Sequence, residues 1–226
     1  MKAIVIGASG GIGSALAAEL EARGSEIVRL SRRSEPALDL EDDETIARAA
    51  AACAGQAPFD LILIATGLLH SQGVTPEKSL RQIDSAALAR LYRVNAIGPA
   101  VVMRHFLPLL ARDRRGVVAA LSARVGSIGD NRLGGWVGYR SSKTALNQII
   151  KTLSIELGRT HPDAILVGLH PGTVETDLSA PFQRNVERSS LFTPARSATH
   201  LIDVIDRLTT ADSGGCFDWA GERIAP

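Results

Sequence analysis

The segment that ends in Tyr139 and Lys143 carries the residue types that proton transfer to a carbonyl group requires. The two residues are four positions apart, so on a helix they lie on one face, one turn from each other. A free tyrosine has a pKa of about 10, and a nearby ammonium group lowers the pKa of a phenol. Tyr139 is therefore a candidate general acid and base, with Lys143 as its electrostatic support.

The hydroxyl group that polarises the carbonyl is expected from the residues just before this pair. Ser122 and Ser127 are the two candidates. Ser122 directly follows an apolar run, and on a strand it points to the face opposite that of residue 123. Ser127 lies in the loop that follows. The residue types leave the choice between the two serines open.

Short apolar runs alternate with longer stretches of helical period, and these elements must position the site. The apolar runs cover residues 2–6, 26–30, 61–65, 117–121 and 164–169, and the helical stretches cover residues 12–23, 43–54, 85–112 and 139–159. Runs that are apolar at nearly every position are typical of parallel strands buried on both faces. The sequence predicts one α/β domain over residues 1–226, a doubly wound, mainly parallel sheet with helices on both sides.

A glycine-rich loop, GASGGIG, joins the first apolar run to the first helical stretch. Its glycines permit a tight strand-to-helix turn and a close approach of the backbone to a pyrophosphate, and the helix then offers unpaired N–H groups to the phosphates. This context predicts a dinucleotide site. The loop residues expected to hold the dinucleotide are Gly7, Ser9, Gly10, Gly11, Ile12 and Gly13.

The end of the second apolar run indicates which dinucleotide binds. Ser31 occupies the position where NAD-binding versions of this arrangement carry an acidic residue for the adenosine 2′-OH, and Arg32 and Arg33 follow it. A guanidinium group suits a 2′-phosphate, which a carboxylate would repel. The sequence therefore favours NADP(H) over NAD(H), with one of the two arginines expected to be a solvated loop charge.

Composition argues against several other classes of protein. The formal net charge of +1 gives no electrostatic reason to expect a nucleic acid or an anionic membrane as partner. The two cysteines suit a reducing compartment and argue against a disulfide framework or a zinc site. No signal-peptide core and no apolar stretch of membrane-spanning length is present, so we expect a cytoplasmic protein.

Over essentially its whole length the chain resembles the short-chain dehydrogenase/reductase family. The matching elements, in chain order, are Gly7-x-x-x-Gly11-Ile12-Gly13, Asp39-Leu40, Val94-Asn95-Ala96-Ile97-Gly98, Tyr139-x-x-x-Lys143 and Pro171-Gly172-Thr173-Val174-Glu175-Thr176. The segments SARVGSIGDNRLGGW, LHPGTVETDLSAPFQ and SGGCFDWAGERI are similar to the C-factor-like branch and to small NADPH-dependent carbonyl reductases.

The resemblance implies a single-domain Rossmann-type fold with a sheet of about seven strands, in which Asp39 follows the third strand. Residues 1–120 would form the cofactor half and residues 121–226 the catalytic half. Two or four copies would associate, with residues 85–112 and 139–159 as candidate interface helices.

The resemblance also implies roles for individual residues. Asp39 would contact the adenine, Lys143 would bind the nicotinamide ribose, and Asn95 would hold a water that relays protons to Lys143. The further cofactor contacts it implies are Leu40, Ala65, Thr66, Gly67, Pro171, Gly172, Thr173, Val174 and Thr176. Thr66 stands in a stretch that departs from the family's Asn-Asn-Ala-Gly and takes over part of its polar role.

One departure from the family bears on activity, because the carbonyl-polarising serine aligns with Ala123. The tyrosine, lysine and asparagine are all present. We therefore expect an NADP(H)-dependent oxidoreductase of small carbonyl compounds or secondary alcohols, with Ser122 or Ser127 as substitute donor. The alternative is a dinucleotide-binding sensor or signalling protein with weak or no catalysis.

Residues 177–193 interrupt the alternation of strands and helices, as a binding loop does. The apolar residues expected to form a lid over a small apolar substrate are Leu178, Phe182, Leu191 and Phe192. Trp136, three residues before Tyr139, either walls the substrate pocket or packs on a neighbouring loop. His170 is read as a structural residue.

Overall fold

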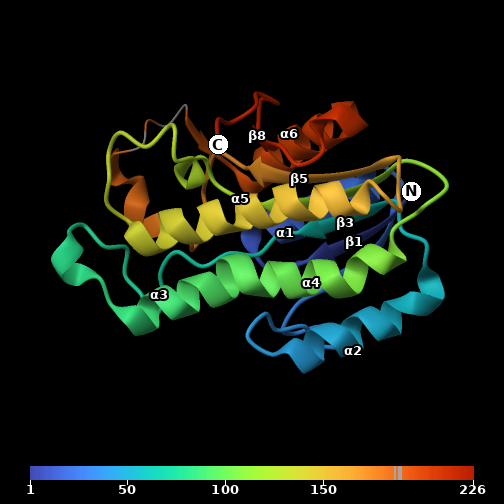
Figure 1. The fold of residues 1–226 in the computed structure, drawn as a ribbon, viewed down its shortest axis with the longest axis horizontal. Helices are drawn as coiled ribbons and strands as arrows, with labels where there is room; N and C mark the ends of the chain where they lie inside the picture. Colours follow the sequence, from blue (N-terminus) through green and yellow to red (C-terminus); the bar gives the residue numbers. More distant parts are fainter. Residues whose placement is uncertain (186, 188–189) are drawn as a thin grey trace.

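The computed structural model describes residues 1–185, 187 and 190–226, and a parallel six-stranded sheet forms its centre (Figure 1). The strands are β1 (Lys2–Ile6), β2 (Glu26–Leu30), β3 (Leu61–Ile64), β4 (Gly116–Leu121), β5 (Ala164–His170) and β8 (Cys216–Asp218). They lie in the order β2-β1-β3-β4-β5-β8, with every neighbouring pair parallel. Their carboxyl ends therefore meet at one edge of the sheet.

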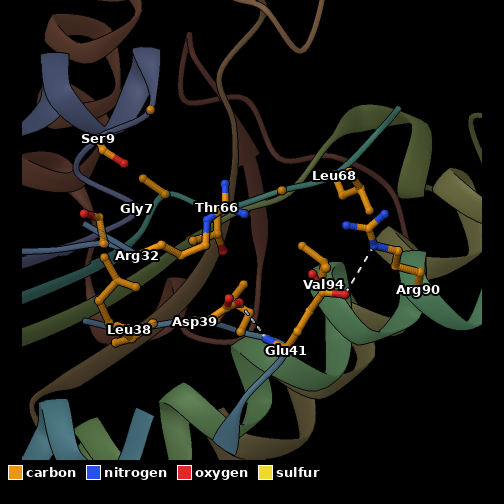
Figure 2. Close-up of a pocket in the computed structure, with 16 residues that line it drawn as sticks. Gly7, Ser9, Arg32, Leu38, Asp39, Glu41, Thr66, Leu68, Arg90 and Val94 are labelled. Carbon is orange, nitrogen blue, oxygen red and sulfur yellow. Dashed lines mark hydrogen bonds and ion pairs between the residues drawn. The ribbon is translucent and has the colours of Figure 1, made fainter. Parts of the chain in front are cut away.

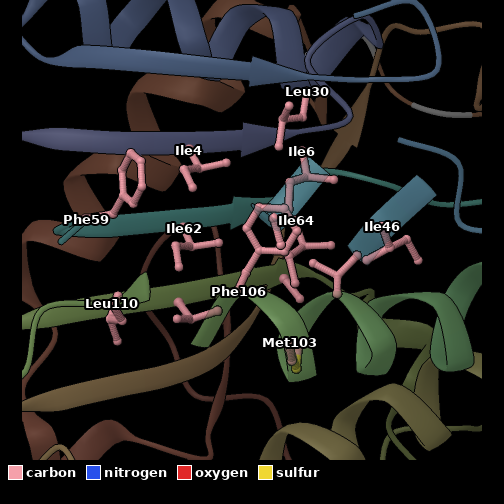
Figure 3. Close-up of a cluster of buried hydrophobic side chains, with 14 of the residues drawn as sticks. Ile4, Ile6, Leu30, Ile46, Phe59, Ile62, Ile64, Met103, Phe106 and Leu110 are labelled. Atoms are coloured by element: carbon pink, nitrogen blue, oxygen red, sulfur yellow. The ribbon is translucent and has the colours of Figure 1, made fainter. Parts of the chain in front are cut away.

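Helices cover both faces of this sheet, as the sequence predicts. On one face lie α2 (Asp43–Cys53), α4 (Gly98–Phe106) and α5 (Val137–Leu157), and on the other lie α1 (Gly11–Ala22) and α6 (Pro194–Arg207). Successive residues of β1 alternate between the two cores: Ala3 and Val5 pack towards α1 and α6, whereas Ile4 and Ile6 pack towards α2 and α4 (Figure 3). Burial on both faces explains why β1, β3, β4 and β5 are apolar at nearly every position, whereas β2 at the edge of the sheet exposes Glu26 and Arg29.

The main sheet has six strands rather than about seven, because no strand forms before Asp39. The Ser34 hydroxyl donates to the carbonyl oxygens of Ser31 and Pro36, and the Leu38 N–H donates to the Ser31 carbonyl. These bonds turn the chain back at the end of β2, and Pro36 has no N–H to donate to a ladder. The expected third strand is therefore replaced by a compact turn.

The long helix predicted over residues 85–112 is interrupted. α3 (Ser85–Tyr92) leads into a π-helical turn (Arg93–Ile97), then α4, and a 3-10 turn (Leu107–Leu109) ends the segment. A π-helical turn inserts an extra residue per turn and is frequent at functional sites. It places Asn95, which is fully buried, on the side of the helix that faces α5.

Four elements near the end of the chain were not anticipated from their residues. α6 begins at Pro194, where the Thr193 side chain accepts a hydrogen bond from the Arg196 N–H. β8 has three residues and pairs with β5 at the edge of the sheet. A second sheet of two short strands, β6 (Thr173–Val174) and β7 (Leu191–Phe192), stands after β5.

The order of the sheet reverses at β1, which has β2 on one side and β3 on the other. In an open parallel sheet such a reversal leaves a crevice at the carboxyl ends of the two diverging strands. The loops after β1 and β3 both begin there. None of the helices in the described part of the chain is long and apolar enough to span a membrane.

Candidate active site

An elongated cleft runs along the carboxyl edge of the sheet. Its first part, about 230 Å³, lies over the ends of β1, β2 and β3, and its second part, about 590 Å³, lies between the start of α1, α5 and the loop after β5. The two parts share five lining residues, which are Gly10, Arg32, Ala65, Thr66 and Gly67. The cleft is therefore continuous past the glycine turn.

The glycine turn needs glycine at two of its positions. Gly7 has a φ of +87°, and a Cβ there would lie 2.5 Å from the Ala65 carbonyl oxygen. A Cβ on Gly13 would lie 2.2 Å from the Gly7 carbonyl oxygen. α1 begins after Gly10 with no side chain capping it, so its first N–H groups are available at the cleft.

The first part of the cleft contains the residues that the sequence assigns to the adenosine (Figure 2). Ser31, Arg32, Asp39 and Leu40 all line it. Arg32 is exposed and extends across the pocket towards Thr66 in Figure 2. Arg33 is also exposed and lies outside both parts of the cleft, which makes Arg32 the arginine placed to meet a ligand.

The rim of this part contains an ion pair that the sequence analysis missed. Arg90 Nε lies 3.2 Å from Glu41 Oε1, and both side chains are partly exposed. Arg90 and Val94, which also lines the pocket, are four residues apart on one side of the interrupted helix. Their spacing alone could not identify them, because the pocket that they face is built by the loop after β2.

Thr66 lines both parts of the cleft, and its hydroxyl oxygen is buried without a hydrogen-bond partner among the described residues. A buried hydroxyl without a partner is costly, which favours a ligand that supplies one. Ala65 and Gly67 beside it also line the cleft, so this loop forms its floor on the β3 side.

Tyr139, Lys143 and Ser122 line the second part of the cleft together. Lys143 Nζ lies 6.0 Å from the centroid of the Tyr139 ring and donates a hydrogen bond to the Leu121 carbonyl oxygen at 2.8 Å. The helical spacing of Tyr139 and Lys143 is realised on α5. The structure thus brings the proposed acid, its lysine and one of the two candidate serines to one place.

Burial dominates the pKa values of this pair. It raises the pKa of Tyr139 to about 12 and lowers the pKa of Lys143 to about 8. The expectation that Lys143 lowers the pKa of Tyr139 does not describe this structure, because desolvation of the phenol is the larger effect. With these pKa values the tyrosine holds its proton at neutral pH and the lysine is still mostly charged, which suits a site in which the phenol donates its proton.

The lowered pKa of Lys143 predicts a pH-dependent stability. Between pH 8 and the ordinary lysine value of 10.5 the unfolded chain binds a proton that the folded chain does not, so stability rises with pH in this window. The raised pKa of Tyr139 makes the stability fall with rising pH, but only above pH 10. From pH 8 to pH 10 the free energy of unfolding, measured with urea, should therefore rise by about 2 kcal/mol more for the wild type than for Lys143→Met. Parallel pH profiles for the two proteins would contradict the prediction.

The structure separates the two candidate serines. Ser122 lines the cleft, and its Oγ donates to Asn147 Oδ1 at 2.6 Å. Ser127 lies outside the cleft, where its Oγ accepts the Asp130 N–H at 3.0 Å and is buried next to the end of the chain. Ala123 is buried and also lies outside the lining.

Asn147 was not singled out from the sequence, although its spacing carries a signal. It follows Lys143 by four residues, as Lys143 follows Tyr139, so the three side chains form one stripe along α5. The stripe ends at Ser122 through the Asn147 hydrogen bond.

Asn95 lies under the cleft rather than in its lining. Its Oδ1 accepts the Leu68 N–H at 2.7 Å, and its Nδ2 donates to the Leu68 carbonyl at 2.8 Å and to Ser142 Oγ at 3.0 Å. These bonds join the loop after β3 to α5. Asn95 therefore holds in register the two segments that carry Gly67 and Lys143.

The loop after β5 contributes only part of its predicted cofactor residues to the cleft. Pro171 and Thr176 line it, and the Thr176 methyl group packs against Gly11. Gly172, Thr173 and Val174 lie outside the lining. The residues of this loop that line the cleft without having been assigned to the cofactor are Glu175, Asp177 and Leu178.

The residues predicted as a lid divide into two groups. Phe182 packs edge-on against Trp136, with ring centroids 5.1 Å apart, and Trp136 packs in the same way against Tyr139 at 6.2 Å. Phe192 is buried against Trp219, away from the cleft. Trp136 thus both contacts the neighbouring loop and borders the tyrosine. Three residues of the stretch 177–193, Val186, Arg188 and Ser189, lie outside the described residues.

Comparison with known proteins agrees with this geometry. The family model described as short chain dehydrogenase matches residues 1–187. The chain is 30% identical over 222 residues to 1-hydroxy-2-glutathionyl-2-methyl-3-butene dehydrogenase of a Rhodococcus species, covering 93% of each chain. It is 34% identical over 147 residues to C-signal of Myxococcus xanthus, covering 65% of this chain and 82% of that protein.

A solved structure shares the fold. The NADPH-bound carbonyl reductase from chicken fatty liver superposes with a TM-score of 0.86 at 23% identity, over 100% of this chain and 98% of that one. The parallel sheet, the cleft at its carboxyl edge and the family match define an oxidoreductase fold. The protein belongs to the short-chain dehydrogenase family.

Proposed function

We propose that this protein is an NADP(H)-dependent reductase of small aldehydes or ketones, with Tyr139 as the acid that protonates the carbonyl oxygen. The observation that carries the proposal is the single cleft that contains the glycine turn, Arg32, Tyr139, Lys143 and Ser122. A binding loop without chemistry would not need a buried tyrosine and lysine at its end.

The residues of the cleft fit a dinucleotide phosphate. The uncapped start of α1 and the glycine turn would hold the pyrophosphate, and the surface formed by Asp39 and Leu40 would receive the adenine. Arg32 makes no ion pair with the residues that the structure describes, and its guanidinium would meet the 2′-phosphate. The Thr66 hydroxyl would gain the hydrogen-bond partner that it lacks.

When bound, NADPH supplies the hydride that reduces the carbonyl carbon. The Tyr139 phenol donates its proton to the carbonyl oxygen, which becomes the hydroxyl group of the alcohol product. Lys143 stabilises the negative charge that remains on the tyrosine oxygen. In the opposite direction Tyr139 accepts the proton from an alcohol.

In this proposal Ser122 polarises the carbonyl, and Asn147 determines the direction in which the Ser122 hydroxyl hydrogen points. With Oδ1 towards Ser122, as in this structure, Asn147 accepts the hydroxyl hydrogen. With its amide turned over, Nδ2 donates to Ser122 Oγ, and the serine hydrogen is free to point at the substrate. The second arrangement is the one that catalysis requires.

The proposal is tested by following NADPH oxidation by absorbance with a panel of small aldehydes, ketones and quinones. Turnover that saturates with a panel member and is slower with NADH supports it. The absence of carbonyl-dependent oxidation across the panel, in protein that binds NADPH, speaks against it.

Replacing Arg32 by alanine should remove most of the preference for NADPH. The variant loses a charge-assisted contact to the phosphate. This loss should lower kcat/KM for NADPH by about tenfold to hundredfold and leave kcat/KM for NADH unchanged. Arg33→Ala, one residue along and outside the cleft, is the matched control and should keep the wild-type ratio. Equal losses with both cofactors in Arg32→Ala would show that the arginine does not read the 2′-phosphate.

A second candidate is a dinucleotide-binding signalling protein with little turnover. Two observations favour it: Ala123 replaces the family's serine, and part of the chain is similar to a protein named C-signal. Calorimetric binding of NADPH without turnover of any panel member would support this candidate. Ala123→Ser would then be assayed, because recovery of turnover would identify a reductase that has lost one hydroxyl group.

A further inference from the structure

The chain enters α5 through a strained turn. Gly134, Gly135 and Trp136 have φ values of 62°, 69° and 55°, three successive residues in the left-handed region. Glycine adopts this conformation readily, but a tryptophan does not. Trp136, with a ψ of 42°, is the only non-glycine residue with positive φ among the residues that the structure describes. Such strain persists only where surrounding contacts impose it.

Glu77 supplies those contacts from a distant part of the chain. Its backbone carbonyl accepts the Trp136 N–H at 2.6 Å, and its two carboxylate oxygens each lie 3.2 Å from the Gly138 nitrogen. The side chain is 3% exposed although it is ionisable. A buried carboxylate needs compensation, and here the Gly138 N–H at the start of α5 provides it.

Space around this contact is closely filled. A Cβ on Gly138 would lie 2.6 Å from Leu91 Cδ1 and 2.9 Å from Glu77 Oε1. No side chain of the turn itself caps α5. Glu77, which lies 61 positions before Gly138 in the chain, takes the place of a local capping residue. Figure 1 shows the segment between β3 and α3 lying at the end of α5 where the helix begins.

The residues that Glu77 holds are the two that border the proposed reaction site. Gly138 directly precedes Tyr139, and Trp136 packs edge-on against the Tyr139 ring with an angle of 70° between the planes. Trp136 then contacts Phe182 from the loop after β6. A change in the turn would therefore move the indole ring relative to the phenol that donates the proton.

We propose that Glu77 is a positioning residue for carbonyl reduction, which fixes Trp136 beside Tyr139 and so sets how the carbonyl substrate is bound. The inference rests on the proposed function for its kinetic consequence, whereas the position of Trp136 is measurable without turnover. A purely structural Glu77 would stabilise the start of α5 and do nothing else.

Asp84 offers a matched control for that structural role. Its carboxylate caps α3, accepting the Ala87 N–H at 2.8 Å, and it is exposed and outside the cleft. Asp84→Ala and Glu77→Ala both remove a carboxylate from the start of a helix. Only Glu77 contacts the turn that carries Trp136.

The experiment uses the full chain with Trp219→Phe, which leaves Trp136 as its one tryptophan. Glu77→Gln, Glu77→Ala and Asp84→Ala are compared by tryptophan emission, acrylamide quenching, melting temperature and kinetics. We expect both Glu77 variants to shift the emission and increase quenching, and to raise KM for the carbonyl substrate about tenfold with KM for NADPH unchanged. Asp84→Ala should lower the melting temperature alone.

Glu77→Gln keeps the shape of the side chain but replaces one of the two acceptor oxygens at the Gly138 N–H by an amide donor, so it weakens this contact and tests the inference even where Glu77→Ala does not fold. Wild-type emission and an unchanged carbonyl KM in Glu77→Gln would overturn the positioning role. If the parent protein shows no turnover, the proposed function fails, and the emission of Trp136 still decides whether Glu77 holds it.

Discussion

Tyr139→Phe should lower carbonyl reduction by about three orders of magnitude while NADPH still binds. The variant removes a single oxygen atom, and the phenyl ring retains the packing against Trp136. With no proton at that position, the alkoxide formed by hydride addition is not neutralised. The measurement is kcat/KM for the best carbonyl substrate, with NADPH affinity determined separately by calorimetry.

The matched control is Tyr92→Phe, because Tyr92 is the other tyrosine of the chain and ends α3 outside the cleft. It should keep wild-type kinetics. Residual activity in Tyr139→Phe within tenfold of the wild type would exclude Tyr139 as the acid and would direct attention to Lys143.

Ser122→Ala should lower kcat by about a hundredfold, the typical effect of removing one donor from a developing oxyanion. Ser122 is the serine that lines the cleft with Tyr139 and Lys143. Because the contact strengthens as charge develops on the oxygen, the effect should appear in kcat more than in KM. Steady-state kinetics over a range of substrate concentrations separates the two.

Ser127→Ala is the matched control for this variant, since it removes the same atom from the serine outside the cleft. It loses the hydrogen bond from the Asp130 N–H, so a small decrease in melting temperature with unchanged kinetics is expected. The reverse pattern, with Ser127→Ala inactive and Ser122→Ala active, would show that the loop after β4 rearranges when substrate binds.

Much of the fold is determined by local sequence. The apolar runs at β1 to β5 are strands within a residue or two of their predicted bounds, because burial on both faces favours apolar side chains at nearly every position of all but the edge strand β2. The glycine turn is equally local, since two of its positions exclude any Cβ. Tyr139 and Lys143 are on one helix face because their spacing alone puts them there.

Other features depend on side-chain hydrogen bonds that the pattern of apolar residues does not reveal. The strand expected before Asp39 is absent because Ser34 turns the chain back through its own hydrogen bonds. The helix over residues 85–112 is interrupted by a π-helical turn that lets Asn95 reach Leu68 and Ser142. Neither partner is identifiable from the periodicity of the helix.

The candidate active site likewise has features set by local sequence and features set by the tertiary structure. Sequence by itself determined the dinucleotide turn, the Tyr139–Lys143 pair and the lack of a hydroxyl group at Ala123, since each depends on residue type or on spacing within one element. Only the tertiary structure decided that Ser122 rather than Ser127 lines the cleft with Tyr139, and that Glu77 reaches the start of α5. These contacts join segments tens of residues apart, and they form only once the packed sheet has brought the loops at its carboxyl edge together.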